Sequence, residues 1–162
     1  MRMAYTMKTD GLAEISEMLG KLETEADAAA SAALYEGAGI MANEITRSAE
    51  GIRTEPFRYT VFGTRSPSPE EKEAVTGAGA VGIAKFDKNG TEVNTSVGYG
   101  HSGYADTFGR QKAVAQIANA INSGTSFMQK QPFIRKAQSK GEPQAAERMK
   151  ETIEERLNRI TR

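Results

Sequence analysis

Apolar residues in the first third of the chain recur at intervals of three and four, which places them on one stripe of a helix. The stripe contains Leu12, Ile15, Leu19, Leu22, Ala26, Ala29 and Ala33. Thr9 and Asp10 suit the start of this helix as caps. Thr24 and Asp27 offer a second cap. We therefore expect a break near Leu22 and a longer helix over about 25–48, preceded at 1–9 by a mobile arm or an edge strand.

Alternating apolar and polar residues indicate strands in the middle of the chain. Segments 80–87 and 92–99 flank Lys88-Asn89-Gly90, and Asn-Gly between apolar runs is a strong hairpin signal. One face of the second segment is more apolar than the other, which is typical of a half-buried antiparallel strand. That face carries Val93, Thr95, Val97 and Tyr99, and the opposite face carries Glu92, Asn94 and Ser96. The Gly-rich residues 100–109 are predicted to form a loop.

Residues 51–78 are loop-rich, and one short helix is predicted within them. Ser68 is a suitable cap, Pro69 suits the first helical position, and Glu71 lies where its side chain reaches back to the cap. Gly77 is expected to end this helix after two turns.

Two helices are predicted in the last third of the chain. The first covers 112–123, with a buried stripe of Val114, Ile117 and Ile121. The second covers 132–162, with an interruption at Gly141 and Pro143 because both residues disfavour a helix interior. This last helix docks on its own subunit or on a neighbour, and the pattern does not distinguish the two. Together these elements predict an α+β fold in one domain over 1–162, in which the long N-terminal helix and the C-terminal helix pack against a small antiparallel sheet.

Residues 121–137 form the most informative block of the chain. Gly124 can take the left-handed conformation that ends a helix. Pro132 fits the first turn of a new helix, and Phe133 is its first large apolar residue. We therefore predict two helices joined by a sharp turn, with Gly124, Thr125, Pro132 and Phe133 as its structural signature and Phe133 buried as the anchor.

The order of residues in this block resembles a known family. Gly-Thr-Ser, then Gln-Pro-Phe, then Arg135-x-Ala137 before a charged C-terminal helix is similar to the neck and tail-completion proteins of siphophages, the gene-product-ten-like tail components of the head–tail joining region. Segments 33–40, 79–86 and 92–99 match further blocks of that family in the same order. The matching blocks and the final helix cover most of the chain.

The resemblance implies a structural role in a phage or prophage-derived particle. It implies a homo-oligomeric ring that completes the head-proximal end of the tail or joins the tail to the head. The implied partners are other copies of the chain, the tail-terminator, major tail or head-closure proteins, and DNA passing non-specifically through the channel. The implied location is the virion, after assembly in the bacterial cytoplasm, and no cofactor is required.

Composition limits the remaining classes of function. The chain has 162 residues, no cysteine and no tryptophan, and 38% of its residues are hydrophobic. Disulfides and thiolate metal sites are therefore excluded. No apolar run approaches the length of a membrane span, and no signal-peptide stretch begins the chain. We expect a soluble cytoplasmic protein whose lean core leaves part of its stability to contacts between copies.

The net charge is zero, but the charges are unevenly distributed. Residues 10–50 contain nine acids and two bases, whereas residues 107–141 contain six bases and no acid. Two interpretations fit the acidic and basic segments equally well. They are solvated faces that neutralise each other within the monomer, or they form a contact surface for another copy or for phosphate. Arg110 and Lys112 are expected to open the helix at 112–123. The candidate interface residues are Arg110, Lys112, Gln129, Lys130, Arg135 and Lys136. The alternative function is a nucleic-acid-binding accessory protein that uses 107–141.

No catalytic, metal or cofactor site is predicted. His101 is the only histidine, and together with Ser102 and Asp106 it supplies the residue types of a hydrolytic triad. All three lie in one short Gly-rich loop without a rigid nucleophile turn or oxyanion donors, so a solvated loop is the favoured interpretation and a hydrolase the third function class. A G-x-G-x-x-G spacing at 77–82 precedes a strand instead of opening a helix, which does not fit a dinucleotide site.

Overall fold

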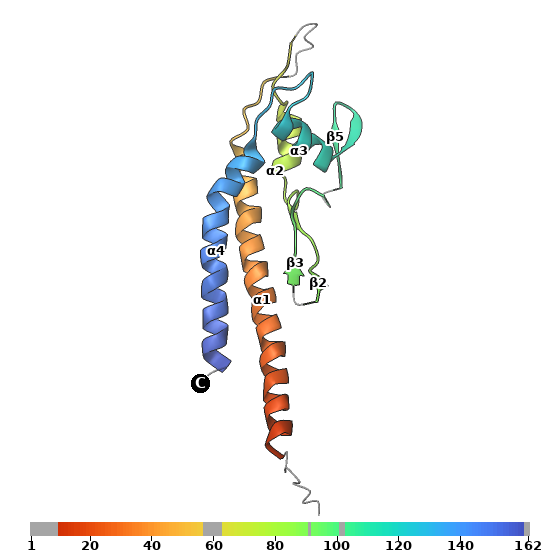
Figure 1. The fold of residues 1–162 in the computed structure, drawn as a ribbon. Helices are drawn as coiled ribbons and strands as arrows, with labels where there is room; N and C mark the ends of the chain where they lie inside the picture. The colour runs from red at the N-terminus through yellow and green to blue at the C-terminus, as the bar shows by residue number, and fades with distance from the viewer. Residues whose placement is uncertain (1–9, 57–62, 91, 101–102, 161–162) are drawn as a thin grey trace, which may run out of the picture.

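Two long helices run antiparallel along the molecule, and the shorter elements lie against one side of them (Figure 1). The computed structural model describes residues 10–56, 63–90, 92–100 and 103–160. The long helices are α1 (Asp10–Glu50) and α4 (Phe133–Ile160). Between them in sequence come α2 (Pro69–Thr76), β1 (Gly82–Ile83), β2 (Asp87–Asn89), β3 (Glu92–Asn94), β4 (Val97–Gly98), β5 (Tyr104–Thr107), β6 (Arg110–Ala113) and α3 (Val114–Ser123).

The strands make small antiparallel sheets, so the fold is α+β as predicted. Within the described residues, β1 pairs with β4, β2 with β3, and β5 with β6. The predicted strands 80–87 and 92–99 are each split in two. Where the strands are interrupted, the Thr95 hydroxyl donates to the Ala84 carbonyl at 2.8 Å, so a side-chain hydrogen bond joins the two segments there. Alternation in the second segment is confirmed, because its predicted inner face is at least half-buried and its outer face is exposed.

A hairpin replaces the predicted loop at 100–109 and the first residues of the predicted helix at 112–123. β5 and β6 pair directly around the two residues Phe108 and Gly109. Both have positive φ, 56° and 69°, as in the two-residue turns that match the twist of a hairpin. The loop prediction was wrong because phenylalanine is an unusual residue for this conformation. The Phe108 N–H donates to the Glu70 carboxylate at 3.2 Å, and the Arg65 guanidinium lies 5.7 Å from the Phe108 ring.

The predicted break near Leu22 is wrong, because α1 is continuous. The Thr24 hydroxyl donates to the Gly20 carbonyl at 2.9 Å inside the helix and caps no new one. The predicted arm at 1–9 lies outside the described residues.

The predicted interruption of the last helix is also wrong, because α4 runs through Gly141 and Pro143. Gly141 lies against α1 so closely that a Cβ there would be 2.8 Å from the Met41 sulfur. Gly37 on α1 approaches α4 in the same way, because a Cβ there would lie 2.6 Å from the Met149 sulfur. At these two glycines α1 and α4 therefore pack closely on each other, and this contact overrides the low helix propensity of Gly141. The first turns of α4 lie at an angle to the rest of the helix (Figure 1), as expected for a helix that contains proline.

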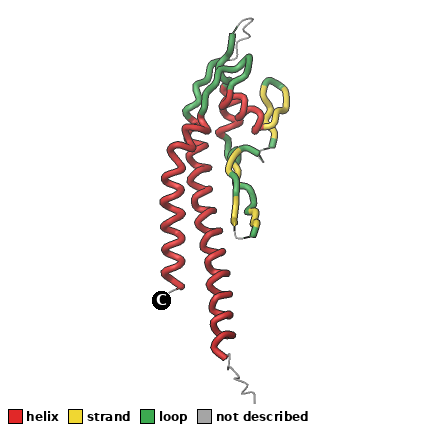
Figure 2. The backbone as a smooth tube through the Cα atoms, in the orientation of Figure 1, coloured by secondary structure: helices red, strands yellow, loops and turns green. Residues whose placement is uncertain are grey.

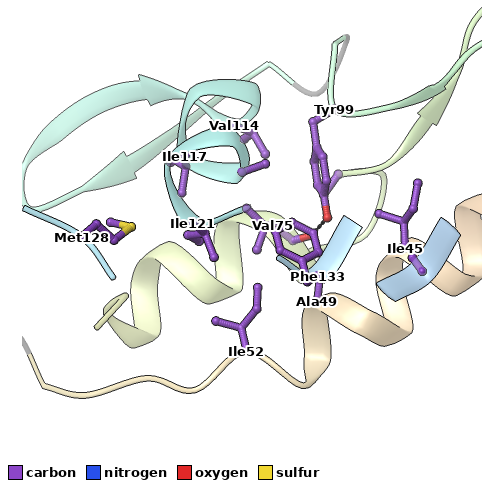
Figure 3. Packing of buried hydrophobic residues seen from close by; sticks show 13 residues of the cluster. Ile45, Ala49, Ile52, Val75, Tyr99, Val114, Ile117, Ile121, Met128 and Phe133 are labelled. Carbon is purple, nitrogen blue, oxygen red and sulfur yellow. Dashed lines mark hydrogen bonds between the residues drawn. The ribbon is translucent and has the colours of Figure 1, made fainter. Parts of the chain in front are cut away.

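The main core lies where the end of α1 meets α2, α3 and the start of α4 (Figure 3). Its larger buried members are Ile45, Ile52, Val75, Tyr99, Val114, Ile117, Ile121, Met128 and Phe133. Phe133 is 3% exposed, so its predicted burial is confirmed. The described loop residues 51–56, 63–68 and 124–132 lie together at the end of the molecule beyond this core (Figure 2), where Arg65 and Met128 form a parallel bridge.

Candidate partner-binding surfaces

Gly124 shapes the turn between α3 and α4. Its φ of 77° and ψ of 163° confirm the predicted positive φ at the end of a helix, in a region that only glycine adopts readily. Its N–H donates to the Ala120 carbonyl at 2.9 Å. A Cβ at this position would lie 2.9 Å from the Lys130 Cβ and 3.2 Å from the Lys130 backbone nitrogen. The turn therefore holds Lys130 close to the end of α3.

Polar side chains fix the rest of this turn. Thr125 Oγ1 accepts from the backbone N–H groups of Phe127 and Met128 at 3.2 and 3.0 Å. Asn122 Oδ1 accepts from the Ile134 N–H at 3.1 Å and so caps α4 from the end of α3. Pro132 directly precedes α4, which begins at Phe133. The signature block is therefore a rigid joint and not a loose loop.

Gln131 connects this joint to the chain that leaves α1. Its side-chain amide pairs with the Arg53 backbone as a neighbouring peptide group would, because Nε2 donates to the Arg53 carbonyl and Oε1 accepts from the Arg53 N–H, both at 2.9 Å. The Gln131 N–H donates to the Ile121 carbonyl at 2.8 Å. One glutamine thus joins the segment after α1 to the segment before α4.

A groove lies along this junction. Its volume is 680 Å³, and it is lined by Gly51, Arg53, Thr54, Glu55, Ser66, Gln129, Lys130, Gln131, Pro132 and Lys136. A neighbouring hollow of 200 Å³ shares Gly51, Gln131 and Lys136 with it and adds Arg47 and Lys140. We call the two together the basic groove. Its lining contains five bases and one acid, so it favours an anionic partner.

The acids of α1 and the bases of 107–141 differ in their ion pairing. Four acids of α1 are paired within the molecule, in the pairs Glu17–Lys21, Asp27–Lys88, Glu36–Arg148 and Glu44–Arg47. Over the residues that the structure describes, no base between 107 and 141 has an ion-pair partner. The acid-free segment is therefore not neutralised by α1 within the monomer.

The structure brings together only some of the predicted interface residues. Gln129, Lys130 and Lys136 line the basic groove, whereas Arg135 is exposed on α4 outside its lining. Arg110 and Lys112 lie on β6 and do not open α3, so that prediction was wrong.

Arg53 is one of three groove bases that are not among the predicted interface residues, together with Arg47 and Lys140. It lies 78 residues before Gln131, and no local pattern links the two positions. Its place in the groove follows from the amide contact between them, which only the folded chain makes.

A separate hollow, of 310 Å³, lies beside α3 and the segment that follows it. It is lined by Arg65, Glu71, Lys112, Gln116, Ile117, Ala120, Thr125, Phe127 and Met128. We call it the Phe127 hollow. Phe127 is 76% exposed, while Ile117 and Met128 belong to the core. The hollow therefore opens from the edge of the core and has an apolar lining with a basic side chain, Lys112, on it.

A buried ion pair supports the wall of this hollow. The carboxylate of Glu71, which is 2% exposed, receives two bonds of 2.7 Å from the Arg65 guanidinium and one of 3.0 Å from the Ser68 N–H. The Glu71 N–H donates to Ser68 Oγ at 3.2 Å, which confirms the predicted capping box. Burial alone raises the pKa of Glu71, but these hydrogen bonds and the Arg65 charge outweigh it and hold the pKa below its ordinary value.

Another polar cluster joins the two long helices. Arg148 donates to the Glu36 carboxylate at 2.6 Å, and the Thr152 hydroxyl donates to it at 3.0 Å. The Thr152 hydrogen bond lowers the pKa of Glu36 most, and with the Arg148 hydrogen bond and charge it outweighs the opposing effect of burial. This cluster fixes the register of α4 on α1.

Within the described residues, the candidate hydrolytic and dinucleotide-binding residues do not form a site. His101 and Ser102 lie outside the described residues, and Asp106 is exposed on β5. Gly77 ends α2 and Gly82 begins β1, so the glycine spacing lies in a turn between a helix and a strand. Across the described ranges there is no group of three potential metal ligands, and no helix there has the length and apolar character to cross a membrane.

No family model, curated protein or solved structure matches this chain.

Proposed function

We propose that this chain is a structural virion protein that completes the head-proximal end of a phage tail, or joins the tail to the head, as a ring of identical copies. The observation that carries the proposal is the basic groove, whose bases from 107–141 have no ion-pair partner among the described residues. Charges left unpaired on one surface favour a partner with the opposite charge.

The resemblance to siphophage neck and tail-completion proteins supports the proposal. Its separate blocks pack on one another in this chain: Tyr99 from the strand block contacts Phe133 from the last block, and Gly37 from the helix block contacts α4. A closed ring also needs two different surfaces that complement each other. The basic groove is one such surface, and its charge requires an acidic surface on the next copy.

The test is deletion of the gene from the phage or prophage genome that encodes it. We expect separate heads and tails, or tails of abnormal length or ending, by electron microscopy. Wild-type protein supplied in trans restores normal particles, whereas a variant with Lys130 and Lys136 changed to Glu restores fewer. Normal infectious particles after deletion contradict the proposal.

A nucleic-acid-binding accessory protein is the second candidate, because phosphate also fits unpaired bases without nearby acids. Duplex DNA binding by the purified chain that falls steeply with salt, and is lost in the same double variant, favours this candidate. Normal particle assembly after gene deletion, together with such binding, selects it over the virion role.

A further inference from the structure

The first part of α1 extends beyond every element that packs on it. The end of α4 lies beside Glu25 and Ala28, with which Arg156 and Arg159 line a shallow hollow, and the β2–β3 hairpin reaches α1 at Asp27. Residues 10–24 continue the helix past this point for about 22 Å at 1.5 Å per residue (Figure 1). We call residues 10–24 the overhang.

The overhang exposes large apolar side chains. Leu19 is 60% exposed and Leu22 is 42% exposed, and their spacing places them on the same face of α1. A free helix of this length is only marginally stable in water, and most helical stability in proteins comes from packing of the apolar face. A partner that covers Leu19 and Leu22 therefore stabilises the overhang.

Charge argues against a second overhang as that partner. Residues 10–24 contain four acids, Asp10, Glu14, Glu17 and Glu23, and one base, Lys21. Two such helices side by side bring like charges together, which is destabilising. The complementary surface is apolar and basic.

The Phe127 hollow has that character. Ile117, Ala120, Phe127 and Met128 give it an apolar lining, and Lys112, which has no ion pair with any described residue, adds a positive charge. Arg65 is already bound to Glu71 there and keeps the wall in place. α3 and the segment after it, which line the hollow, lie at the opposite end of the molecule from the overhang, so one copy cannot satisfy both within itself (Figure 1).

We propose that the overhang of one copy docks in the Phe127 hollow of a second copy, with Leu19 and Leu22 against Phe127 and Met128 and with the overhang acids near Lys112. The partner is thus a second copy of this chain, and the contact is heterologous, as a ring requires. Only the role of this contact in a particle rests on the proposed virion function, because the contact is expected to form between copies of the purified chain.

Site-specific crosslinking tests the contact. The chain has no native cysteine, so single cysteines report on single positions. Full-length Leu19→Cys protein is mixed with full-length Phe127→Cys protein and oxidised over a range of concentrations, and disulfide-linked dimers are resolved by non-reducing electrophoresis. The matched control replaces Phe127→Cys with Tyr104→Cys, because Tyr104 is an aromatic residue of similar exposure, 74%, on β5. Circular dichroism melting checks that each variant is folded.

We expect the Leu19/Phe127 mixture to give a crosslinked heterodimer and the Leu19/Tyr104 mixture to give only background. Addition of Lys112→Glu to the Phe127→Cys protein reduces the crosslink. Preferential crosslinking of Leu19→Cys to itself shows overhang pairing and overturns the proposal, as does equal crosslinking with both mixtures or with neither. Gene deletion tests the virion role separately. If the crosslink forms but the deletion leaves normal particles, the virion role is excluded and the contact between copies is still supported.

Discussion

The ring of Tyr99 meets the ring of Phe133 edge to face, with 6.0 Å between the centroids and 75° between the planes. The Tyr99 hydroxyl donates to the Val75 carbonyl at 3.0 Å. Burial raises the pKa of Tyr99, so the phenol keeps the proton that it donates. This pair connects the end of the central hairpin, α2 and the start of α4, and it makes Phe133 the anchor of the signature block.

Replacement of Phe133 by alanine is expected to destabilise the chain by about 3–5 kcal/mol, because it removes a buried ring and leaves a cavity. Urea or thermal unfolding measures the loss. Phe127→Ala is the matched control, since Phe127 is 76% exposed and its replacement is expected to change the stability of the monomer little. A Phe133→Ala melting temperature within a degree of wild type contradicts the anchor role.

Gly124→Ala is expected to destabilise the chain by about 1 kcal/mol or more, because a Cβ is disfavoured at positive φ. The close approach of Lys130 to Gly124 adds to this cost. Gly90→Ala separates the two effects: Gly90 has a similar φ of 64° but nothing within 4 Å of an added Cβ. Equal losses in the two variants, measured by urea unfolding, show that the contact with Lys130 contributes nothing.

Simultaneous reversal of Lys130, Arg135 and Lys136 to Glu is expected to weaken assembly while the monomer stays folded, and raised salt is expected to mimic it. Each exposed ion pair contributes only about 0–1 kcal/mol, so the effect depends on several pairs repeated between copies. Sedimentation of the chain, alone or with its tail partners, measures it.

Two double variants then locate the effect of these charges. Lys130→Glu with Lys136→Glu changes the groove lining, whereas Arg135→Glu with Lys150→Glu changes exposed bases of α4 outside it. We expect only the first to reduce assembly. Assembly that is insensitive to salt and to every reversal leaves apolar contacts alone to hold the copies together.

Glu71 is expected to make stability depend on acid pH. Its pKa in the folded chain lies below its ordinary value of 4.5, so its contribution is fully present above the unfolded pKa and is lost as the pH falls through the lower, folded pKa. Glu71→Gln removes that contribution, because the neutral amide carries no charge to pair with the Arg65 guanidinium. Urea unfolding from neutral to acidic pH is therefore expected to show a lower stability and a weaker acid-side decline in the variant. Parallel pH profiles for the two proteins contradict the assignment.

Features that depend on neighbouring residues could be predicted from the sequence. Ser68, Pro69 and Glu71 specify the start of α2, because a capping box closes within one turn. Gly124 marks the end of α3, since the positive φ is a local property that favours glycine. Asn89-Gly90 places the central hairpin, and the periodic apolar stripe places most of α1. These predictions are confirmed because the interactions that decide them are local.

Features that depend on distant residues could not be predicted and follow from the folded chain. α4 continues through Gly141 because the missing side chain lets α1 approach, and Phe108 takes a positive φ where Glu70 and Arg65 hold it. Arg53 joins the basic groove through Gln131, far along the chain. Likewise, composition located the bases of 107–141, but the fold pairs Asp27 and Glu36 of α1 with Lys88 and Arg148 and leaves those bases without ion pairs among the described residues. Contacts between segments far apart in sequence set these outcomes, and no local pattern encodes them.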